Sequence, residues 1–334
     1  MKRFTGKDIF PFIHGVLSCS VNENGLVELN RFTEAQKQRY RETGDQKNIP
    51  FIDRANASSG VTLEMDTDSS FIAFTPVMTP GCRPFAAFDC WVDGVLHGHW
   101  YHEDITQVPV SFELPEGMHR VQLFFPWTAI VKLAEVVVDE GAVVQPVRKA
   151  GRFLVFGDSI TQGYITVHPS CGYVNLLGLD LDKESVNQAV GGYWFDADTL
   201  DASLTGYDPD FILVAYGTND YSLMTSPESF TENCRAFTGR LTELFPGKKI
   251  LGILPIYRND LKHIARSRMW DFKPEDGIRT IREIYAGYPD ITVLEDNFFP
   301  RHADFLAPDF LHPNDLGNMF YAGAVIRAVR EMLG

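Results

Sequence analysis

The sequence predicts two domains of different fold class: an all-β sandwich over residues 1–147 and an α/β domain with a five-stranded parallel sheet over residues 148–334. At about 150 residues per domain, a chain of 334 residues has room for two. The first half carries short strand-like runs between turn residues, as β-sandwiches do. In the second half, short apolar strands alternate with helical stretches, which indicates a parallel sheet covered on both faces. We place the boundary within residues 144–149.

The first half contains short candidate strands, at residues 61–65, 71–74, 88–92, 95–96, 108–114 and 118–125. Apolar and polar residues alternate over 61–65 (Val-Thr-Leu-Glu-Met), which is the period of a half-buried strand. Asp93-Gly94 predicts a tight hairpin turn between two of these strands. Pro115-Glu116-Gly117 predicts a second hairpin in the same way, and one short helix near residues 33–42 interrupts the strands.

The second half contains short apolar strands, at residues 152–156, 186–190, 211–215, 250–254 and 291–294. Ser226-Pro227-Glu228 combines a capping serine, a first-turn proline and a first-turn acid, so it predicts the start of a helix. The last helix has apolar residues at i+4 spacing, which predicts one buried stripe of Leu316, Phe320, Ala324, Ala328 and Met332. Ligands in such folds bind at the carboxyl ends of the strands.

Residues suited to nucleophilic catalysis lie at these strand ends. Ser159 follows the first strand, and Asp309 and His312 precede the last helix. A serine hydroxyl becomes a good nucleophile when a neighbouring base takes its proton, and an imidazole can do this near neutral pH. Asp309 would hold the other ring nitrogen of His312 and stabilise the imidazolium. The alternative for Ser159 is a plain helix cap.

Acyl transfer also needs hydrogen-bond donors for the developing oxyanion. The sequence offers the amide of Ser159, the amide of Gly192 after the second strand, and the side-chain amide of Asn219 after the third. Loss of one such donor typically costs about 3 kcal/mol. The alternative for Asn219 is a turn residue. We interpret Asp158 and Asp220 as support for their loops.

These segments resemble the SGNH/GDSL hydrolase superfamily, whose four blocks are named for Ser, Gly, Asn and His. The matching segments occur in order, at residues 157–160 (Gly-Asp-Ser-Ile), 187–192 (Asn-Gln-Ala-Val-Gly-Gly), 217–220 (Gly-Thr-Asn-Asp) and 309–312 (Asp-Phe-Leu-His). Ile160 replaces the usual Leu. Ala189 replaces a frequent Gly, so the second block matches more loosely, and its oxyanion glycine maps to Gly192 rather than Gly191. Four blocks in order are a specific signal, and the resemblance, over roughly residues 150–334, implies a flavodoxin-like three-layer SGNH hydrolase domain.

The first half resembles, more loosely, the jelly-roll domain that precedes SGNH domains in some carbohydrate acetyl esterases, including carbohydrate esterase family 2. Residues 57–61, 66–69 and 88–94 carry this likeness. Some members of that group lack the triad acid, but this chain keeps Asp309. The two resemblances imply a serine esterase that hydrolyses short-chain acyl esters, chiefly O-acetyl esters of carbohydrates, through a Ser-His-Asp triad. The 25 Phe and 12 Tyr fit a β-rich portion or a sugar-facing surface.

Two other functions use the same residues. An acyltransferase would form the same acyl-enzyme but pass the acyl group to an alcohol, and only the acceptor pocket would differ. A carbohydrate-binding protein with an inactive SGNH domain is the second, and the four intact blocks argue against it. The expected partner is a small-molecule or oligosaccharide ester, with the oligomeric state left open.

Aromatic residues near these blocks are candidate substrate-binding groups. Tyr193 and Trp194 follow the oxyanion glycines, and Trp270 lies in the long segment 256–273. They could wall the acyl pocket or stack on a sugar ring, and core packing is the alternative for the first two.

His97, His99 and His102 form the run His-Gly-His-Trp-Tyr-His. Metal binding is one interpretation, because His97 and His99 share a strand face. No carboxylate–histidine framework completes it, so we favour a polar strand face and expect no metal. We interpret Cys171 as a packed thiol, because no base is evident beside it.

Composition and missing motifs exclude several classes. The net charge of −14 argues against nucleic acid and anionic membranes as main partners. Five Cys without a Cys-x-x-Cys pair, no signal-peptide pattern and no apolar run of about 20 residues predict a cytoplasmic protein with free thiols. No phosphate-binding or dinucleotide-binding glycine motif is present, so no cofactor is expected. The absence of Gly-x-Ser-x-Gly excludes an ordinary α/β-hydrolase.

Overall fold

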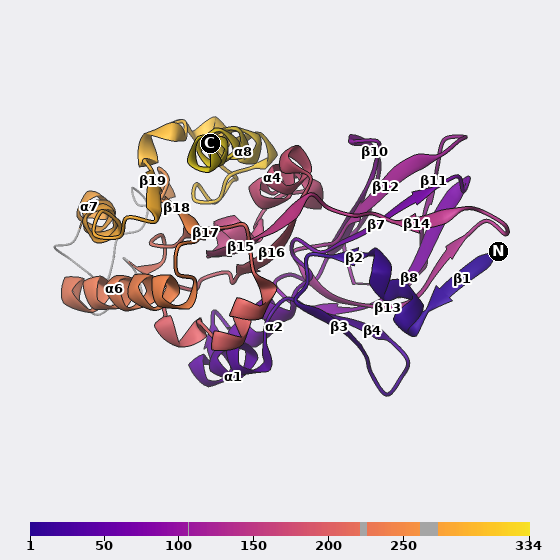
Figure 1. Cartoon of the computed structure of the whole chain (residues 1–334), viewed down its shortest axis with the longest axis horizontal. Helices are drawn as coiled ribbons and strands as arrows, with labels where there is room; N and C mark the ends of the chain where they lie inside the picture. The colour runs from indigo at the N-terminus through magenta and orange to yellow at the C-terminus, as the bar shows by residue number, and fades with distance from the viewer. Residues whose placement is uncertain (106, 221–225, 261–272) are drawn as a thin grey trace.

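The computed structural model describes residues 1–105, 107–220, 226–260 and 273–334. Figure 1 shows two parts side by side: antiparallel sheets at the end where the chain begins, and a parallel sheet between helices at the other end. The predicted fold class, an α/β domain preceded by an all-β sandwich, is confirmed. The last strand of the antiparallel part ends at Pro146 and the first parallel strand begins at Gly151.

The antiparallel part consists of two sheets. One has the order β11 (Val110–Glu113), β8 (Phe71–Pro80), β13 (Ala129–Val138), β4 (Val27–Asn30) and β3 (Ser18–Val21), with β1 (Lys2–Thr5) beside β13. The other has the order β10 (Val95–His102), β9 (Ala86–Val92), β12 (His119–Phe124), β7 (Thr62–Thr67) and β14 (Val144–Pro146), with β2 (Ile13–His14) beside β7. A 3₁₀ helix, η1 (Gly6–Phe12), follows β1. The rings of Phe74, Phe88 and Phe125 meet in the core, with centroids 5.0–6.0 Å apart.

One predicted hairpin is confirmed and the other is wrong. Asp93 and Gly94 have φ of 49° and 81°, the left-handed pair that a tight turn between β9 and β10 requires. By contrast, β11 pairs with β8 in one sheet, whereas β12 pairs with β7 and β9 in the other. Residues 115–117 therefore carry the chain across the sandwich. Turn residues report a local reversal of the chain and do not specify which sheet receives the next strand.

A helical excursion leaves the sandwich and packs on the α/β part. It comprises α1 (Glu34–Thr43), the short strands β5 (Asp45–Gln46) and β6 (Ile49–Pro50), and α2 (Phe51–Asn56). The predicted helix near residues 33–42 is α1, which begins with a capping box between Thr33 and Gln36. Tyr40 and Phe51 are buried against Tyr193 of the α/β part. The first half of the chain thus contributes to the surroundings of the second.

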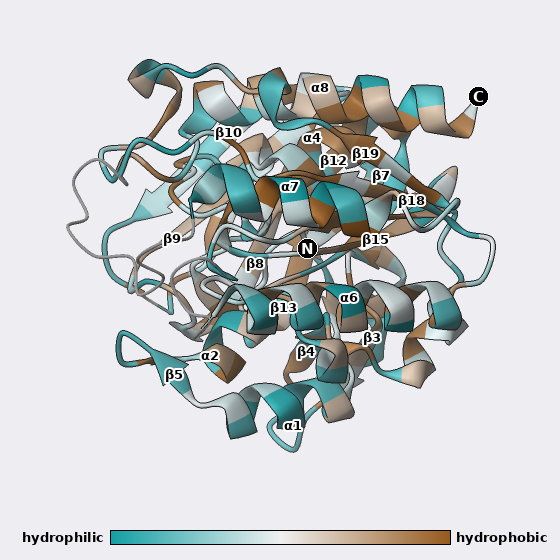
Figure 2. Cartoon of the chain, turned by 90° about the vertical axis from the view of Figure 1, so that its left-hand side faces the viewer, coloured by the Kyte–Doolittle hydropathy of each residue, from teal (hydrophilic) through white to brown (hydrophobic). Residues whose placement is uncertain are grey.

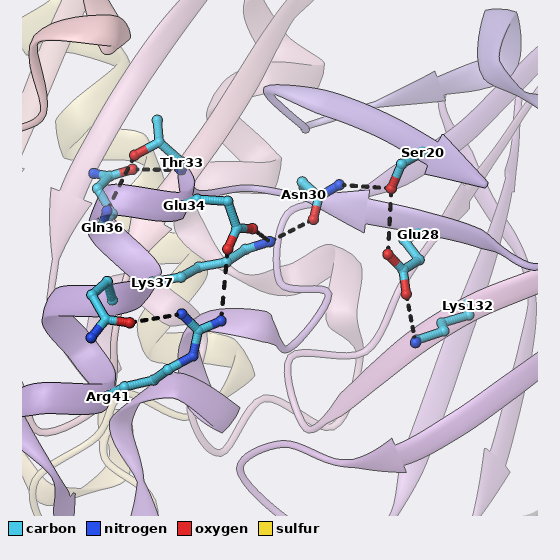
Figure 3. A network of polar contacts seen from close by, with 10 residues as sticks. Ser20, Glu28, Asn30, Thr33, Glu34, Gln36, Lys37, Arg41 and Lys132 are labelled. Atoms are coloured by element: carbon cyan, nitrogen blue, oxygen red, sulfur yellow. Dashed lines mark hydrogen bonds and ion pairs between the residues drawn. The ribbon is translucent and has the colours of Figure 1, made fainter. Parts of the chain in front are cut away.

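Polar contacts tie α1 to the neighbouring sheet (Figure 3). Lys37 Nζ lies 2.7 Å from Asn30 Oδ1 and 2.9 Å from Glu34 Oε1. Glu28, on the same strand as Asn30, pairs with Lys132 Nζ of β13 at 2.7 Å. Partly exposed pairs of this kind contribute little free energy of folding, so we take them to set the direction in which the helix leaves β4.

The parallel sheet has the order β16 (Lys183–Ala189), β15 (Gly151–Gly157), β17 (Phe211–Ala215), β18 (Lys249–Ile253) and β19 (Ile291–Leu294). In chain order this is 2-1-3-4-5, the flavodoxin-like arrangement. Its helices are α3 (Ser159–Gln162), α4 (Tyr173–Leu181), α6 (Pro227–Leu244), α7 (Pro274–Tyr285) and α8 (Asp315–Leu333). Short 3₁₀ helices are η2 (Pro169–Cys171), η3 (Ala197–Thr199), η4 (Ala202–Tyr207), η6 (Asp296–Phe298) and η7 (Ala303–Phe305).

Alternate residues of each parallel strand point to opposite faces, and helices bury both. Phe153 and Val155 of β15 pack with α4 and α8, whereas Leu154 and Phe156 pack with α6 and α7. Figure 2 shows the mainly hydrophobic strands β15 and β18 between these helices, whose outer surfaces are more polar. Within the described residues, none of the helices has the length and apolar character needed to cross a bilayer.

The predicted helix start at Ser226 is confirmed, whereas the predicted apolar stripe of α8 is buried only in part. Ser226 caps α6 by accepting from the Ser229 amide, as predicted. In α8, however, Leu316 and Phe320 are each 48% exposed. Tyr321, Val325 and Val329 are buried, as are Ala324 and Met332 of the predicted stripe. With 3.6 residues per turn, each i+4 step moves about 40° around the helix, so the stripe starts at the surface and reaches the core from Ala324 onward.

Candidate active site

The carboxyl ends of three neighbouring strands coincide. Gly157, the last residue of β15, pairs in register with Ala189 of β16 and with Ala215 of β17. β15 lies between β16, the next strand along the chain, and β17, the strand after that, so the strand order reverses at β15. Such a reversal is the topological switch point where open α/β folds bind ligands. Three of the predicted blocks therefore emerge at one edge of the sheet.

The structure brings Ser159, His312 and Asp309 into one hydrogen-bonded chain. Ser159 is the first residue of α3, is 5% exposed, and its Oγ lies 2.7 Å from His312 Nε2. His312 Nδ1 lies 2.6 Å from Asp309 Oδ2. An ionised carboxylate can only accept, so Nδ1 carries the proton, and Nε2 is left to accept the Ser159 hydroxyl hydrogen. This is the arrangement in which an imidazole can act as the base of a serine nucleophile.

Asp309 is held as a carboxylate by its own loop. Its Oδ1 accepts the amides of Leu311 and His312, both at 3.0 Å. Burial on its own would raise the pKa of Asp309, but the hydrogen bonds and charge of His312 and these amides lower it to about 2. The ionised acid fixes the tautomer of His312 at every pH near neutrality.

Residues of the β-sandwich pack on Tyr164, whose ring stacks on His312. Tyr164 stacks on His312 with centroids 5.5 Å apart. Trp127, from the sandwich, packs on Tyr164 at 4.6 Å, and the guanidinium of Arg83 lies 5.2 Å from the Tyr164 ring. His312 is therefore backed by aromatic rings from both halves of the chain.

The two glycines of the second block differ in their amide partners. The Gly191 amide donates to Gln162 Oε1 at 2.6 Å. No hydrogen bond from the Gly192 amide is found within the described residues. Gly192 has a φ of 78°, which favours glycine, and a Cβ there would overlap Gln46 Oε1. These contacts favour Gly192 over Gly191 as an oxyanion donor, in line with the prediction.

Asn219 lies on the loop after β17, where its side-chain nitrogen donates to the Tyr193 carbonyl at 2.9 Å. This bond joins the third block to the segment that follows Gly192. The Ser159 amide belongs to the first turn of α3, where a helix leaves its amides without intrahelical acceptors. The oxyanion roles of Ser159, Gly192 and Asn219 remain predictions, and the loops that carry them lie at one sheet edge.

Support for the glycine turn comes from residues that the sequence analysis missed. Arg54 Nη1 donates to the Gly191 carbonyl at 2.5 Å and to Gln46 Oε1 at 3.0 Å. Gln162 Nε2 donates to the Arg54 carbonyl at 2.7 Å, which closes a ring of contacts around the turn. Nothing in the local sequence of α2 marks Arg54, because its partners are distant along the chain.

Arg31 joins the same excursion to the parallel sheet. Its buried guanidinium donates to the carbonyls of Ala55 and Ala57, each at 2.8 Å, and to that of Asn187 on β16. Burial lowers the pKa of Arg31 to about 10. Carbonyl oxygens from both halves of the chain thus satisfy one buried cation.

Buried carboxyls stabilise the loops beside the site. Asp158 accepts the Ile160 amide at 3.0 Å, and burial raises its pKa to about 6. Asp220 accepts the Phe195 amide at 3.2 Å, and burial, with Asp158 nearby, raises its pKa to about 7. These contacts agree with the loop-support roles that we inferred for both residues.

The three aromatic residues that we predicted to bind substrate differ in their surroundings. Tyr193 is fully buried and donates its hydroxyl hydrogen to Asp196 at 2.7 Å, so its side chain belongs to the core and cannot wall a pocket. That prediction is corrected. The ring of Trp194 stacks on Tyr193 at 4.5 Å and is only partly buried, so its substrate contact stays a prediction. Trp270 lies outside the described residues.

The three histidines of β10 do not form one cluster. His97 contacts the Glu113 carbonyl at 2.9 Å and His102 contacts the Asp104 carbonyl at 2.8 Å. A register shift between Leu96 and Gly98 breaks the alternation that placed His97 and His99 on one face. His99 instead meets a carboxylate, described below. Burial raises the pKa of Cys171 to about 12, which suits a packed thiol.

Comparisons with known proteins identify a family whose model matches part of this chain. The model of the GDSL-like lipase/acylhydrolase family matches residues 155–319, a span that includes Ser159, Asp309 and His312. No curated protein sequence matches the chain.

Among solved structures, the chain is similar to the salicylyl-acyltransferase SsfX3 from a tetracycline biosynthetic pathway, at 21% identity and a TM-score of 0.79, over 99% of this chain and 97% of that one. A protein from Bacteroides ovatus, titled as a GDSL-like lipase, gives 17% identity and a TM-score of 0.75 over 99% and 98% of the two chains. A family two carbohydrate esterase from Cellvibrio japonicus gives 18% identity and a TM-score of 0.67 over 99% and 97%. At these identities the structural likeness concerns the fold, and it extends over both parts of the chain. The α/β part therefore carries a GDSL-like lipase/acylhydrolase domain over residues 155–319.

Proposed function

We propose that the chain is a serine esterase that removes short acyl groups, chiefly O-acetyl groups, from carbohydrates. The observation that carries the proposal is the relay from Ser159 Oγ to His312 Nε2 at 2.7 Å and from His312 Nδ1 to Asp309 Oδ2 at 2.6 Å. Two distant segments of the chain meet there with each donor and acceptor correctly matched. A serine that merely capped a helix would not need an oriented imidazole.

In the proposed mechanism, Ser159 Oγ attacks the ester carbonyl carbon while His312 Nε2 takes the hydroxyl proton. The oxygen of the tetrahedral intermediate accepts hydrogen bonds from the amides of Ser159 and Gly192 and from the Asn219 side chain. Collapse breaks the bond to the alkoxy oxygen, which leaves as the alcohol with the proton from His312. Water then attacks the acyl carbon while His312 takes one of its protons. Collapse breaks the bond from the acyl carbon to Ser159 Oγ, which regains the proton from His312, and the carboxylic acid leaves.

The sandwich and its contacts with the site support the carbohydrate preference. The similarity to a family two carbohydrate esterase extends along the whole chain, including the sandwich. Two residues of that sandwich, Trp127 and Arg83, pack on the Tyr164 ring, which stacks on His312. We assign the contact with the sugar to Trp194, which is partly buried and follows the Gly192 turn. We therefore infer that the substrate is a small acetylated sugar or oligosaccharide.

Acyl transfer to an alcohol is the second candidate. It is favoured by the similarity to a salicylyl-acyltransferase over 99% of this chain. The acyl-enzyme would be the same, but an alcohol bound in place of water would accept the acyl group. Incubation with an activated ester and a panel of sugar alcohols, followed by mass spectrometry of the products, separates the two. Free acid as the main product supports the esterase, whereas a new ester as the main product supports the transferase.

The test of the esterase uses Ser159→Ala with Ser203→Ala, an exposed serine of η4, as the matched control. We expect Ser159→Ala to lose turnover of p-nitrophenyl acetate and of acetylated sugars, and Ser203→Ala to keep it. A fluorophosphonate probe should label the wild type and the control but not Ser159→Ala. Unchanged turnover in Ser159→Ala, or a wild type that the probe does not label, refutes the proposal.

A further inference from the structure

A second cluster of polar side chains lies where the sandwich meets the α/β part. It joins Asp89 of β9, His99 of β10 and His168, which precedes η2 in the segment that follows α3. Asp89 Oδ1 lies 2.6 Å from His99 Nδ1 and 3.0 Å from His168 Nδ1. The two imidazole rings lie with centroids 4.3 Å apart. Three ligand-type atoms from distant segments therefore converge within 4.8 Å of one another.

The surroundings hold the carboxylate in one orientation. Asp89 is fully buried, and its second oxygen, Oδ2, accepts both the amide and the hydroxyl of Ser170, at 2.9 and 2.6 Å. In metal sites, hydrogen bonds to the carboxylate oxygen that does not bind the metal hold the other oxygen in place. The side chains of His99 and His168 are 25% and 30% exposed, so part of each imidazole meets solvent.

We propose that Asp89, His99 and His168 bind a divalent transition-metal ion, with Zn²⁺ as the preferred ion. Two imidazole nitrogens and one carboxylate oxygen form a common ligand set for Zn²⁺, with water in the fourth position. Bonds of about 2.0–2.2 Å place tetrahedral ligand atoms about 3.3 Å apart, so the two separations from Asp89 Oδ1 need to open by less than about 1 Å. Each imidazole would move its ring proton to Nε2 and turn the lone pair of Nδ1 toward the ion.

The position of the cluster indicates a structural metal rather than a catalytic one. The ion would tie β9 and β10 of the sandwich to the segment that follows the Ser159 helix. The neighbouring Val167 amide donates to Asp315 Oδ1 at 3.1 Å, and Asp315 is the first residue of α8, three positions after His312. The ion would therefore brace the junction of the two parts close to both catalytic segments, without entering acyl transfer.

The competing interpretation is a hydrogen-bonded cluster alone, in which both rings donate Nδ1–H to Asp89 Oδ1. One variant gives a different result under each interpretation. An asparagine amide nitrogen occupies nearly the place of an imidazole Nδ1, so His168→Asn keeps a donor to Asp89 and loses the metal ligand. His97→Ala is the matched control, because His97 lies on the same strand outside the cluster.

The test is isothermal titration of the full chain, after chelator treatment and desalting, with Zn²⁺. Thermal unfolding is followed with and without Zn²⁺, and Co²⁺ serves as the spectroscopic probe of histidine ligation. We expect one Zn²⁺ per chain, a rise of several degrees in Tm with Zn²⁺, and visible Co²⁺ absorption for the wild type and His97→Ala. His168→Asn should lose all three while its Tm in chelator stays close to that of the wild type.

A wild type without stoichiometric Zn²⁺ binding overturns the proposal and leaves the hydrogen-bonded cluster. Equal loss of binding in His97→Ala overturns it as well, because the ion would then bind elsewhere on β10. Ser170→Ala sharpens the result, since loss of the contacts that orient Asp89 should weaken Zn²⁺ binding by about 10–100-fold without abolishing it. Metal binding is read directly, so the outcome does not depend on the proposed esterase activity.

Discussion

The edge of the parallel sheet and the helical excursion of residues 31–57 contribute to the candidate site in different ways. The edge supplies every group proposed to react, and each lies within a short motif. The excursion supplies no reacting group, yet its Arg54 and Gln46 hold the turn that carries Gly192. The groups proposed to react can therefore be found from short sequence motifs. The groups that position them come from segments distant along the chain, and no motif identifies them.

The largest expected effect is at the edge itself. His312→Ala removes the proposed base, so we expect kcat for p-nitrophenyl acetate to fall by roughly 10⁴–10⁶-fold with little change in Tm. His302→Ala is the control, because His302 is exposed and pairs with Asp304 away from Ser159. If His312→Ala kept turnover within about tenfold of the wild type, the edge would not be the catalytic region.

Gly192 tests the contact between the two regions. Gly192→Ala should lower kcat by about 10²–10³-fold, because the new Cβ meets Gln46 and displaces an oxyanion donor. Gly25→Ala is a matched control with a φ of 77° against 78°, but its Cβ would have nothing within 4 Å. Both variants should lose about 1–2 kcal/mol of stability from the left-handed backbone, and only Gly192→Ala should lose activity. Equal kinetics in the two variants would separate Gly192 from the site.

Arg54 tests the excursion on its own. Arg54→Ala removes the bond to the Gly191 carbonyl, and a lost charged hydrogen bond of about 1.5–3 kcal/mol predicts a fall in kcat of about 10–100-fold. We expect KM to change little, since Arg54 positions the oxyanion turn and does not reach substrate. Arg41→Ala, at an exposed position of the same excursion, serves as the control. A change confined to Tm would show that Arg54 is merely structural, and a change confined to KM would show that it acts in substrate binding instead.

The smallest effect concerns pH and the buried Asp220. Its pKa is raised from 3.8 to about 7 by burial, so the folded state holds the proton more tightly and loses stability as pH rises from about 4 to 7. Asp220→Asn should therefore raise the free energy of unfolding at pH 8 by about 1–2 kcal/mol and leave it nearly unchanged at pH 4. Asp290→Asn, at an exposed site, is the control. A gain at pH 4 equal to that at pH 8 would contradict the burial argument.

The sign is opposite for Asp309, whose pKa is lowered to about 2. Such a group stabilises the folded state above its unfolded pKa of about 3.9, and that contribution is lost as pH falls toward 2. Because Asp309 is partly exposed, solvent screens the interaction and the loss is small. Circular dichroism from pH 8 to pH 2 should therefore show stability that rises slightly on the way to pH 4 and then falls.

Local patterns predicted most of the fold and the residues that the structure brings together around Ser159. The strands at 211–215 and 291–294 match β17 and β19, because a short apolar run between helices is a local feature. Asp309 and His312 lie three positions apart, so their pairing could be inferred without knowing the fold. Ser159 joined them through the order of the blocks.

What failed depends on contacts between distant segments. Residues 115–117 carry turn signals, but the next strand pairs in the opposite sheet. Tyr193 follows the oxyanion glycines, yet the excursion covers it with Tyr40 and Phe51. The partner that His99 meets, Asp89, lies across a hairpin whose register the sequence does not specify, and His168 comes from the other half of the chain.

The most direct test of the account is to trap the acyl-enzyme. The wild type is mixed with p-nitrophenyl acetate, quenched in acid within the first turnover, digested and mapped by mass spectrometry. The account predicts the mass of one acetyl group on the peptide that contains Ser159, and none in Ser159→Ala. A wild type that turns the ester over without that modification, or that carries it on another residue, would contradict the proposed nucleophile.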